Sequence, residues 1–446
     1  MSKKRSQSQK SLRFFISSVK KGIDSVKPYD LIINNLELKG NTLIIRKDEY
    51  DLKNYRKIHL ISVGKGAVSF YKGLKKVLKG IKYSGLIVSY ESEFYEDSKI
   101  KYLPASHPIP DEKSLNAGLK TIEYIKNNVE KDDLVIFSIS GGASAMLVAP
   151  QKRITLEDKI KVNKLLLSSG ADINEINSVR KHLSAIKGGR LAELVYPAKL
   201  VSLILSDIIE SPLENIGSGP TIGDSSSFKD VKNIIKKYDL ESKLPENVLD
   251  FINNSKDETP LPGSRRFRNN SHYLLGDNFV LLKFLKNLFE SNGLKTYILT
   301  SRDNGEAKDV AKLYSAIIKE VIYSDNPFKK PVVILTGGEV TVTLTNPDGK
   351  GGRNQEIVIR MLNELKEIGD KFIIMSVGTD GLDGPTDAAG SYINEKTIKK
   401  VKKLGINIMD YIEKNNSYYF FQKLDQLIKL GSTGTNVMDI RLFYIT

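Results

Sequence analysis

The hydrophobic residues of this chain form short continuous runs that alternate with longer stretches of helical period. Six runs end in Gly, Ser, Asp or Glu: IHLISVG at 58–64, DLVIFSIS at 133–140, KLVSLILSD at 199–207, KTYILTS at 295–301, PVVILTGGE at 331–339 and KFIIMSVGTDG at 371–381. Such runs are typical of buried strands, and helix-period segments follow several of them. The alternation predicts an α/β protein with mostly parallel sheets and helices on both faces.

Local signals mark where some elements begin. Thr155 with Asp158 forms a capping-box pattern, and Asp111 with Glu112 places acids in the first turn of a helix. The segment TGGEVTVTL at 336–344 alternates and then meets the turn-rich NPDGKGG. This pattern predicts a hairpin, and therefore a mixed second sheet.

The length of the chain predicts two domains. It has 446 residues, more than one hydrophobic core usually supports. The polar segment NNSKDETPLPGSRRFRNN carries two prolines and no periodicity, which is typical of a linker. We expect a doubly wound, Rossmann-like domain over 1–255, a linker over 256–270, and a smaller α/β domain with a mixed sheet over 271–446.

Composition excludes several kinds of site. The chain has no cysteine, so disulfides, thiolate metal sites and cysteine nucleophiles are ruled out, and its four histidines are scattered. Any metal should be a hard cation bound by oxygen, such as Mg²⁺. No apolar run is long enough to predict a membrane span or a signal-peptide core. The net charge of +15 is spread over helix-like, lysine-rich stretches and indicates solvated faces.

Candidate site residues follow the predicted strands directly. In an open α/β sheet, ligands bind beyond the carboxyl ends of the strands. The side chains at these positions are Lys65, the loop Ser140–Ser144, Asp207, Ser301, Glu339 and Asp380.

Two glycine-containing turns are candidates for anion binding. Ser140, Gly141, Gly142 and Ser144 stand between a strand and a helix start, where free N–H groups can meet an anion. A tight turn with a serine cap would give the same spacing. Lys65 lies between two glycines in GKGAVS, which is neither a full dinucleotide fingerprint nor a Walker loop. A lysine at a strand end still offers a point charge to a phosphate or carboxylate.

Two further segments carry charged groups on loops. Asp380, Asp383 and Asp387 crowd the segment SVGTDGLDGPTDAAG, where they suit Mg²⁺ coordination or a general base, although a series of turns is the alternative. In GKGGRNQE, Arg353 could clamp a carboxylate or stabilise phosphoryl oxygens, unless the loop is simply solvated. His107 is bracketed by prolines, and a structural role is more common for such a histidine.

The motifs taken together resemble one family. SISGGASAML, EINSVRKHLSAIKGG, LILSDIIESPLENIGSGPTIGD, TGGEVTVTL, GKGGRNQE, GTDGLDGPTDAAG and TGTNVMDI occur in this order. The chain resembles, from about residue 58 to its end, the glycerate 2-kinases that carry a MOFRL C-terminal domain. The resemblance implies phosphorylation of glycerate at C2 by ATP with a divalent cation, in a cleft between the two domains.

For this reaction we predict roles for the candidate residues. ATP would lie against Ser140–Ser144 with its phosphates reaching Lys65, and Asp380 or Asp383 would hold Mg²⁺. Arg353, together with Arg190, would grip the glycerate carboxylate. Asp207 would orient or deprotonate the attacking hydroxyl.

The expected ligands are therefore glycerate and ATP. We expect a cytoplasmic homodimer with no nucleic-acid or membrane partner. The alternative is an oxidoreductase acting on hydroxypyruvate or a similar hydroxy acid, because a Rossmann-like sheet would also serve a nicotinamide. A third possibility, nucleic-acid binding, rests on the net charge alone.

Overall fold

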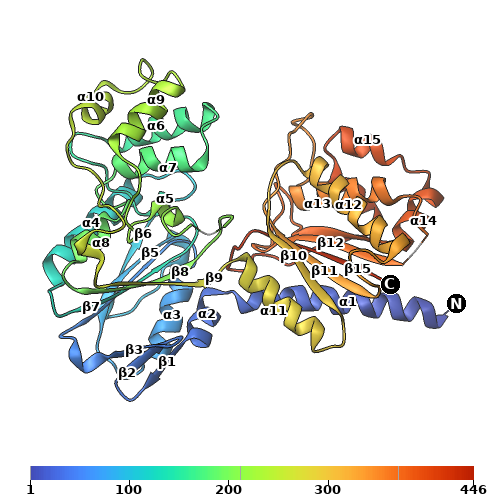
Figure 1. Cartoon of the computed structure of the whole chain (residues 1–446), viewed down its shortest axis with the longest axis horizontal. Helices are drawn as coiled ribbons and strands as arrows, with labels where there is room; N and C mark the ends of the chain where they lie inside the picture. Colours follow the sequence, from blue (N-terminus) through green and yellow to red (C-terminus); the bar gives the residue numbers. More distant parts are fainter. Residues whose placement is uncertain (1, 211, 370) are drawn as a thin grey trace. The chain divides into compact units, whose positions relative to one another are not determined.

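The chain folds into two compact units. The computed structural model describes residues 2–210, 212–369 and 371–446, with side chains from residue 10 onward. The N-terminal unit comprises 28–206 and 212–275, and the C-terminal unit comprises 2–27, 207–210, 276–369 and 371–446 (Figure 1). Both are α/β, in agreement with the predicted fold class.

The N-terminal unit contains a six-stranded sheet, a small three-stranded sheet and nine helices among its described residues. Its strands are β1 (Leu36–Lys39), β2 (Thr42–Ile45), β3 (Asp48–Asp51), β4 (Ile58–Val63), β5 (Ser84–Ser89), β6 (Ile100–Pro104), β7 (Leu134–Ile139), β8 (Lys199–Leu205) and β9 (Asn270–Gly276). Its helices are α2 (Pro28–Asn35), α3 (Ala67–Val77), α4 (Glu112–Asn128), α5 (Ala143–Met146), α6 (Leu156–Ser168), α7 (Ile173–His182), α8 (Arg190–Val195), α9 (Phe228–Lys237) and α10 (Glu246–Asn254).

The large sheet of this unit has the strand order of a Rossmann fold. The order is β6-β5-β4-β7-β8-β9, which is 3-2-1-4-5-6 when the strands are counted from β4. The β5–β6, β4–β5, β4–β7 and β7–β8 pairs are parallel. The order reverses between β4 and β7, so the carboxyl ends of these two strands form the topological switch point where such sheets bind ligands.

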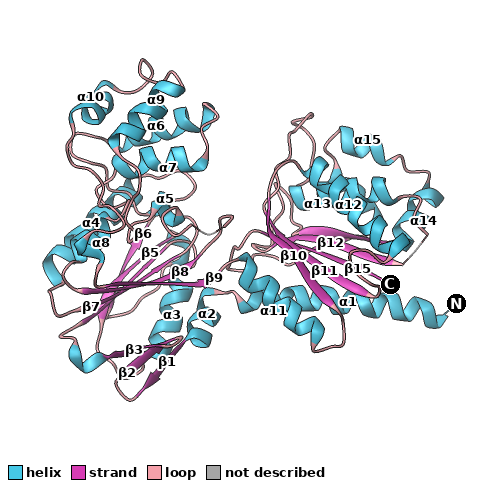
Figure 2. Ribbon diagram, viewed as in Figure 1, coloured by secondary structure: helices cyan, strands magenta, loops and turns pink. Residues whose placement is uncertain are grey.

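A second apolar core lies in the helical part of the N-terminal unit. Helices α6, α7, α9 and α10 gather at one end of the sheet (Figure 2). Val162, Val179, Val231 and Val248, one from each helix, are buried in the cluster between them. Helix α6 begins with the predicted capping box of Thr155 and Asp158, and Asp111 caps α4.

The sheet of the C-terminal unit is mixed, as predicted, but mostly antiparallel. Its strands are β10 (Thr296–Asp303), β11 (Val332–Gly338), β12 (Phe372–Gly378), β13 (Gly390–Asn394), β14 (Leu427–Ile428) and β15 (Asp439–Ile445), in the order β10-β11-β15-β12-β13-β14. Only β10 and β11 pair in parallel among these described strands. Strand β15 lies in the middle of the sheet between β11 and β12 and forms two of the four antiparallel pairs, and β13 forms the other two with β12 and β14.

The predicted hairpin after β11 is wrong. Residues 339–345 form no strand and make one isolated bridge, between Thr341 and Glu306. Side chains take up the alternating threonines instead, since Thr341 and Thr343 both donate to Glu306, at 2.9 and 3.0 Å. Sequence alternation alone could not reveal these competing partners. Ser301 likewise lies inside β10, not after it.

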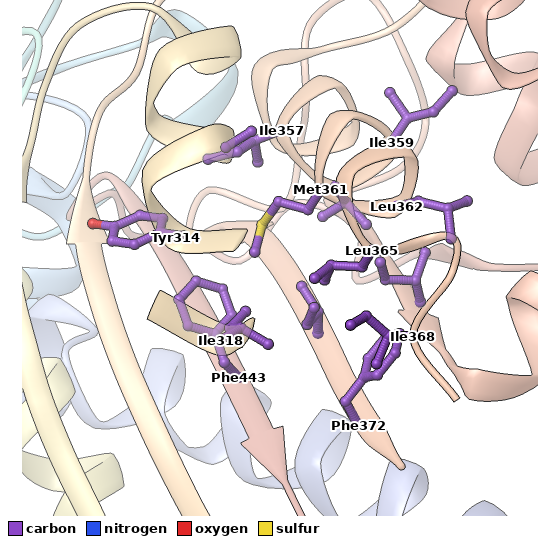
Figure 3. Close-up of a cluster of buried hydrophobic side chains, with 14 of the residues drawn as sticks. Tyr314, Ile318, Ile357, Ile359, Met361, Leu362, Leu365, Ile368, Phe372 and Phe443 are labelled. Carbon is purple, nitrogen blue, oxygen red and sulfur yellow. The ribbon is translucent and has the colours of Figure 1, made fainter. Parts of the chain in front are cut away.

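The helices of the C-terminal unit cover both faces of its sheet (Figure 1). They are α1 (Ser2–Ser25), α11 (Asn278–Glu290), α12 (Ala307–Ser324), α13 (Arg353–Leu365), α14 (Glu395–Leu404), α15 (Ile408–Glu413) and α16 (Ser417–Leu424). Figure 3 shows the core on the α12 and α13 side, where Ile318 and Met361 meet Phe443 of β15. All three are almost completely buried.

The C-terminal unit includes two segments that are distant from its main part in sequence, 2–27 and 207–210. Helix α1 belongs to the C-terminal unit, where Phe15 packs on Phe289 of α11 and on Tyr444 of β15. The segment 256–270 belongs to the N-terminal unit and contains a short 3-10 helix (Arg265–Phe267). Within that segment, Thr259 is buried and donates to Asp224 at 2.9 Å. None of the described helices is both long and apolar enough to cross a membrane.

Candidate active site

Lys65 and the Ser140–Ser144 loop meet at the switch point of the N-terminal sheet. Lys65 follows β4 and Ser140 follows β7, and these strands are neighbours. The Lys65 N–H donates to the Gly141 carbonyl at 2.9 Å, and the Gly66 N–H donates to Ser140 Oγ at 2.9 Å. Two loops 74 residues apart in sequence are therefore joined by hydrogen bonds. We call Lys65 and the loop Ser140–Ser144 together the glycine-loop site.

Glycine is required where these loops come closest. Gly64 has φ +110°, and a Cβ there would lie 2.6 Å from the Ser140 carbonyl oxygen. Gly142 has φ +84°, and its Cβ would lie 3.1 Å from Lys65 Cγ and 3.2 Å from His107 Cδ2. Any side chain would separate the loops, so these glycines allow Lys65 and His107 to flank Gly142.

Lys65 and His107 form the polar part of this site. Lys65 is half-buried, and no described residue accepts a hydrogen bond from its Nζ. His107 Nδ1 lies 3.3 Å from the Tyr90 hydroxyl. Burial, followed by the positive charge of Lys65, lowers the pKa of His107 to about 4. His107 is therefore neutral at physiological pH, and it lies beside Lys65, which its proline-bracketed sequence did not predict.

Ser144 belongs to a second set of contacts behind the glycine-loop site. Its hydroxyl accepts from Lys187 Nζ at 2.8 Å and lies 3.1 Å from Ser218 Oγ. Ser218 in turn donates to Asn177 of α7 at 3.1 Å. Lys187 and Asn177 come from EINSVRKHLSAIKGG, a motif that carries the family resemblance, but nothing in their spacing marks them individually.

Arg190 does not join this cluster. Its side chain is buried, and it pairs with Asp257, whose Oδ2 lies 3.0 Å from Nη1. A further guanidinium N–H donates to the Asp257 backbone carbonyl. Arg190 thus ties α8 to the segment 256–270. This contact gives the Arg190 guanidinium a partner within the chain, and its expected role in gripping glycerate stays a prediction.

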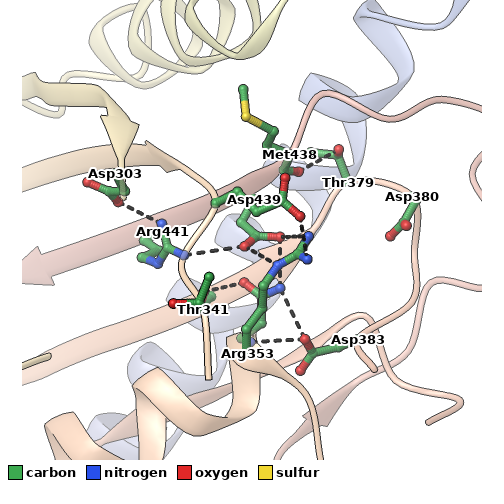
Figure 4. Close-up of polar contacts among 12 residues, drawn as sticks. Asp303, Thr341, Arg353, Thr379, Asp380, Asp383, Met438, Asp439 and Arg441 are labelled. Atoms are coloured by element: carbon green, nitrogen blue, oxygen red, sulfur yellow. Dashed lines mark hydrogen bonds and ion pairs between the residues drawn. The ribbon is translucent and has the colours of Figure 1, made fainter. Parts of the chain in front are cut away.

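Arg353 begins α13 in the C-terminal unit and holds a buried carboxylate (Figure 4). Its Nε donates to Asp439 Oδ2 at 2.7 Å and its Nη2 to Oδ1 at 3.0 Å. Nη1 forms an ion pair with Glu339 at 2.6 Å. Burial by itself lowers the pKa of Arg353, but the negative charges of Asp439 and Glu339 raise it by more. The pKa of Arg353 is therefore well above its ordinary value.

Asp439 also supports a second, fully buried arginine. Arg441 Nη2 lies 3.3 Å from Asp439, and its Nη1 donates to Asp303 at 2.6 Å. Asp439 and Arg441 have no exposed surface, so their charges can be tolerated only as a connected set. This network fixes the end of β15 against β10 and α13.

Asp383 is the N-terminal partner of helix α13. Its Oδ1 accepts from the Asn354 N–H and its Oδ2 from the Gln355 N–H, both at 2.9 Å. The side-chain amides of the same two residues add contacts at 3.3 and 2.9 Å. Burial raises the pKa of Asp383 to about 6. Both oxygens of Asp383 thus accept from N–H donors at the start of α13, and the expected role of Asp383 as a metal ligand stays a prediction.

Three carboxylates lie near Arg353: those of Asp207, Glu339 and Asp380. We call these three residues together with Arg353 the acidic cluster. The pKa of Glu339 is raised, mainly because the side chain is partly buried. The positive charge of Arg353 opposes this shift, and the smaller effects of the nearby carboxylates of Asp439, Asp207 and Asp380 add to it. Asp380 accepts one hydrogen bond, from the Leu382 N–H at 3.1 Å. Among the described residues, no three acidic or histidine side chains are grouped closely enough to hold a metal by themselves.

The candidate residues thus fall into two groups. Lys65, Ser140, Gly141, Gly142 and Ser144 lie together in the N-terminal unit, and Asp207, Arg353, Asp380 and Asp383 lie in the C-terminal unit. Asp207 follows β8 in sequence but is grouped with the C-terminal unit.

Comparison with known proteins covers nearly the whole chain. Residues 15–253 match a family model described as a domain of unknown function, DUF4147, and residues 332–439 match the MOFRL family. A glycerate 2-kinase of Pyrococcus horikoshii is 36% identical over 429 residues, which are 96% of each chain.

Two further relatives bear on the alternatives. The crystal structure of a glycerate kinase from Thermotoga maritima superimposes with a TM-score of 0.86 at 34% identity, and the match covers 98% of this chain and 100% of that one. An Agrobacterium vitis protein, provisionally named as a hydroxypyruvate reductase, is 35% identical over 86% of this chain and 98% of its own.

Proposed function

Because the chain belongs to the glycerate 2-kinase family that carries a MOFRL domain, we propose that it transfers the γ-phosphoryl group of ATP to the C2 hydroxyl of D-glycerate. The hydroxyl oxygen forms the new bond to phosphorus, and the bond to the bridging oxygen of ADP breaks. The hydroxyl proton passes to a carboxylate. The products are 2-phosphoglycerate and ADP.

The nucleotide phosphates bind at the glycine-loop site. The observation that carries this assignment is a half-buried ammonium, Lys65, with no described partner for its Nζ, at the switch point of a Rossmann-ordered sheet. A lysine in this setting has its charge available for phosphate oxygens. Phosphoryl transfer depends mainly on positioning and charge neutralisation, which Lys65 and the loop amides supply.

Arg353 takes the glycerate carboxylate. Three of its five N–H groups are used by Asp439 and Glu339, and 31% of its side chain is exposed, so N–H donors remain for a ligand. Asp439 holds the guanidinium in one orientation. Asp207 accepts the proton of the attacking hydroxyl, and Glu339 is a neighbouring carboxylate.

Between the two aspartates expected to hold Mg²⁺, Asp380 fits the ion better than Asp383. It is half-exposed and accepts a single hydrogen bond, whereas the oxygens of Asp383 are fully engaged. Mg²⁺ commonly takes one or two carboxylates and completes its shell with water and substrate phosphates, so a set of three acidic ligands is not needed. The bound ion would neutralise charge on the phosphates of ATP.

The first test separates kinase from oxidoreductase. The protein is mixed with D-glycerate and either ATP with Mg²⁺ or NAD(P)⁺, and ADP release and reduced nicotinamide are followed. ADP release that depends on glycerate supports the proposal. Reduced nicotinamide without ADP release would contradict it and favour the hydroxy-acid oxidoreductase.

The setting of the enzyme is part of the proposal. A chain without cysteine suits a reducing cytoplasm, and we place the reaction there. The active species is a homodimer. Light scattering coupled to size-exclusion chromatography measures the mass directly, and a single peak at the monomer mass of 49.9 kDa would contradict a dimer.

A further inference from the structure

Lys187 is a buried lysine that the reaction described above leaves without a role. It lies between α7 and α8 and is 3% exposed. Its Nζ donates to the Ser144 carbonyl at 2.7 Å, to Ser144 Oγ at 2.8 Å and to the Gly217 carbonyl at 3.4 Å. An ammonium has three protons, so these three oxygens match its full set of donors.

None of these acceptors carries a charge. Two cations close to Lys187, Lys159 and Arg180, also bind uncharged acceptors. Lys159 Nζ donates to the Leu183 carbonyl at 3.1 Å, and the Arg180 guanidinium donates to the side-chain oxygen of Asn163. No described carboxylate forms an ion pair with Lys159, Arg180 or Lys187. Burial is the main cause that lowers the pKa of Lys187 well below its ordinary value, and the charges of Lys159 and Arg180 add to it.

The acidic residues of this region are already paired. Asp224 binds Lys181 at 3.1 Å, and Glu258 lies 3.1 Å from His182. Asp257 binds Arg190 at 3.0 Å. The three cations Lys159, Arg180 and Lys187 therefore leave a positive field without a matching anion in the described part of the chain. Buried charge without a partner is costly, and a bound anion would relieve the cost.

We infer that Lys187 is a positioning residue that holds Ser144 against the Gly217 turn, and that the phosphates of a nucleotide bound at Ser144 balance the charge of Lys159, Arg180 and Lys187. The inference rests on the proposed binding of ATP at the glycine-loop site. Ser144 is half-buried and makes the contact with the phosphates, because Lys187 is too deeply buried to reach them itself. Lys187 acts through Ser144 and does not touch the reacting atoms.

This arrangement has a consequence for protons. Without ligand, burial lowers the pKa of Lys159 to about 7, so Lys159 is largely neutral at pH 8.5, and burial lowers the pKa of Lys187 in the same direction. Phosphate charge beside Ser144 favours their protonated forms, so binding of ATP draws protons from the buffer. The phosphates of ATP are themselves fully ionised at this pH and take up none.

The experiment is calorimetric titration of the intact protein with MgATP at pH 8.5, in buffers of different ionisation enthalpy. The wild type should take up a measurable fraction of a proton, up to about one per ATP. Lys187→Met should lose part of this uptake and raise the KM for ATP at least about tenfold, which corresponds to 1.4 kcal/mol, with the KM for glycerate unchanged. Lys161→Met, an exposed lysine on α6, is the control and should match the wild type.

The outcomes separate this inference from the proposed function. Binding of ATP without proton uptake by the wild type overturns the inference and leaves the kinase assignment standing, and this arm needs no variant to fold. Absence of any ATP binding overturns both. A Lys187→Met protein that takes up protons and binds ATP as the wild type does also overturns the inference.

Discussion

Arg353 and Asp439, 86 residues apart in sequence, are joined by two parallel hydrogen bonds of 2.7 and 3.0 Å. The carboxylate in this pair is completely buried and also contacts Arg441. A bidentate pair of this kind sets the direction of the guanidinium as well as its charge. The contact thus links the folding of the C-terminal unit to the arginine that we assign to the substrate.

Asp439→Asn should destabilise the C-terminal unit strongly. The amide keeps the shape but leaves Arg353 and Arg441 without their shared negative charge, and breaking a buried pair costs about 3–5 kcal/mol. Urea unfolding followed by circular dichroism measures the change. Asp410→Asn, at an exposed position on α15, serves as the control and should remain within about 0.5 kcal/mol of the wild type.

Lys65→Ala should reduce turnover by about 10²–10³, or roughly 3–4 kcal/mol, because the ammonium meets charge that develops on the transferring phosphoryl group. Its Nζ has no described partner, so stability should not change. Lys79→Ala, an exposed lysine after α3, is the matched control. Near-normal turnover of a folded Lys65→Ala protein would remove this residue from the mechanism.

The two aspartates of the loop after β12 should behave differently. Asp380→Asn should raise the Mg²⁺ concentration needed for half-maximal activity, because an amide keeps the shape of a carboxylate but loses its charge. Asp383→Asn should instead lower stability by about 0.5–2 kcal/mol through loss of the helix cap. If only Asp207→Asn shifts the Mg²⁺ requirement, the metal ligand has been assigned to the wrong carboxylate.

His107 should make stability depend on pH in a defined direction. Its pKa falls from 6.5 to about 4 on folding, so between these values the unfolded chain binds more protons than the native protein. The contribution of neutral His107 to stability is therefore present above pH 6.5 and is lost as the pH falls toward 4. His107→Gln should flatten the decline in unfolding free energy between pH 7 and pH 5. An unchanged slope would show that His107 is not held neutral.

Local sequence patterns were sufficient for strands β4, β7, β8, β10, β11 and β12, for the caps of α4 and α6, and for the closeness of Lys65 to Ser140. Buried strands such as β4 and β7 consist of continuous apolar residues, and the residues that follow them in sequence must lie at the same edge of a parallel sheet. Lys65 and Ser140 therefore come together for a reason that the sequence already contains.

The remaining features depend on partners distant in the chain. Nothing around residue 353 indicates that Asp439 takes two of the five N–H groups of its guanidinium. In the sequence, Asp383 looks like a loop carboxylate, and only the fold shows that α13 begins beside it. Helix α1 carries no local signal that Phe15 will pack on Phe289. Lys187 resembles any other lysine in a lysine-rich chain, because its burial is a property of the folded loops.

The regiochemistry of the product tests the central claim most directly. The protein is incubated with D-glycerate, ATP, Mg²⁺, enolase, pyruvate kinase, lactate dehydrogenase and NADH, with no phosphoenolpyruvate added. Enolase uses 2-phosphoglycerate only, so transfer to the C2 hydroxyl predicts NADH oxidation without phosphoglycerate mutase. If NADH is oxidised only after the mutase is added, the product is 3-phosphoglycerate, and the proposed C2 transfer and the Arg353 carboxylate clamp are both contradicted.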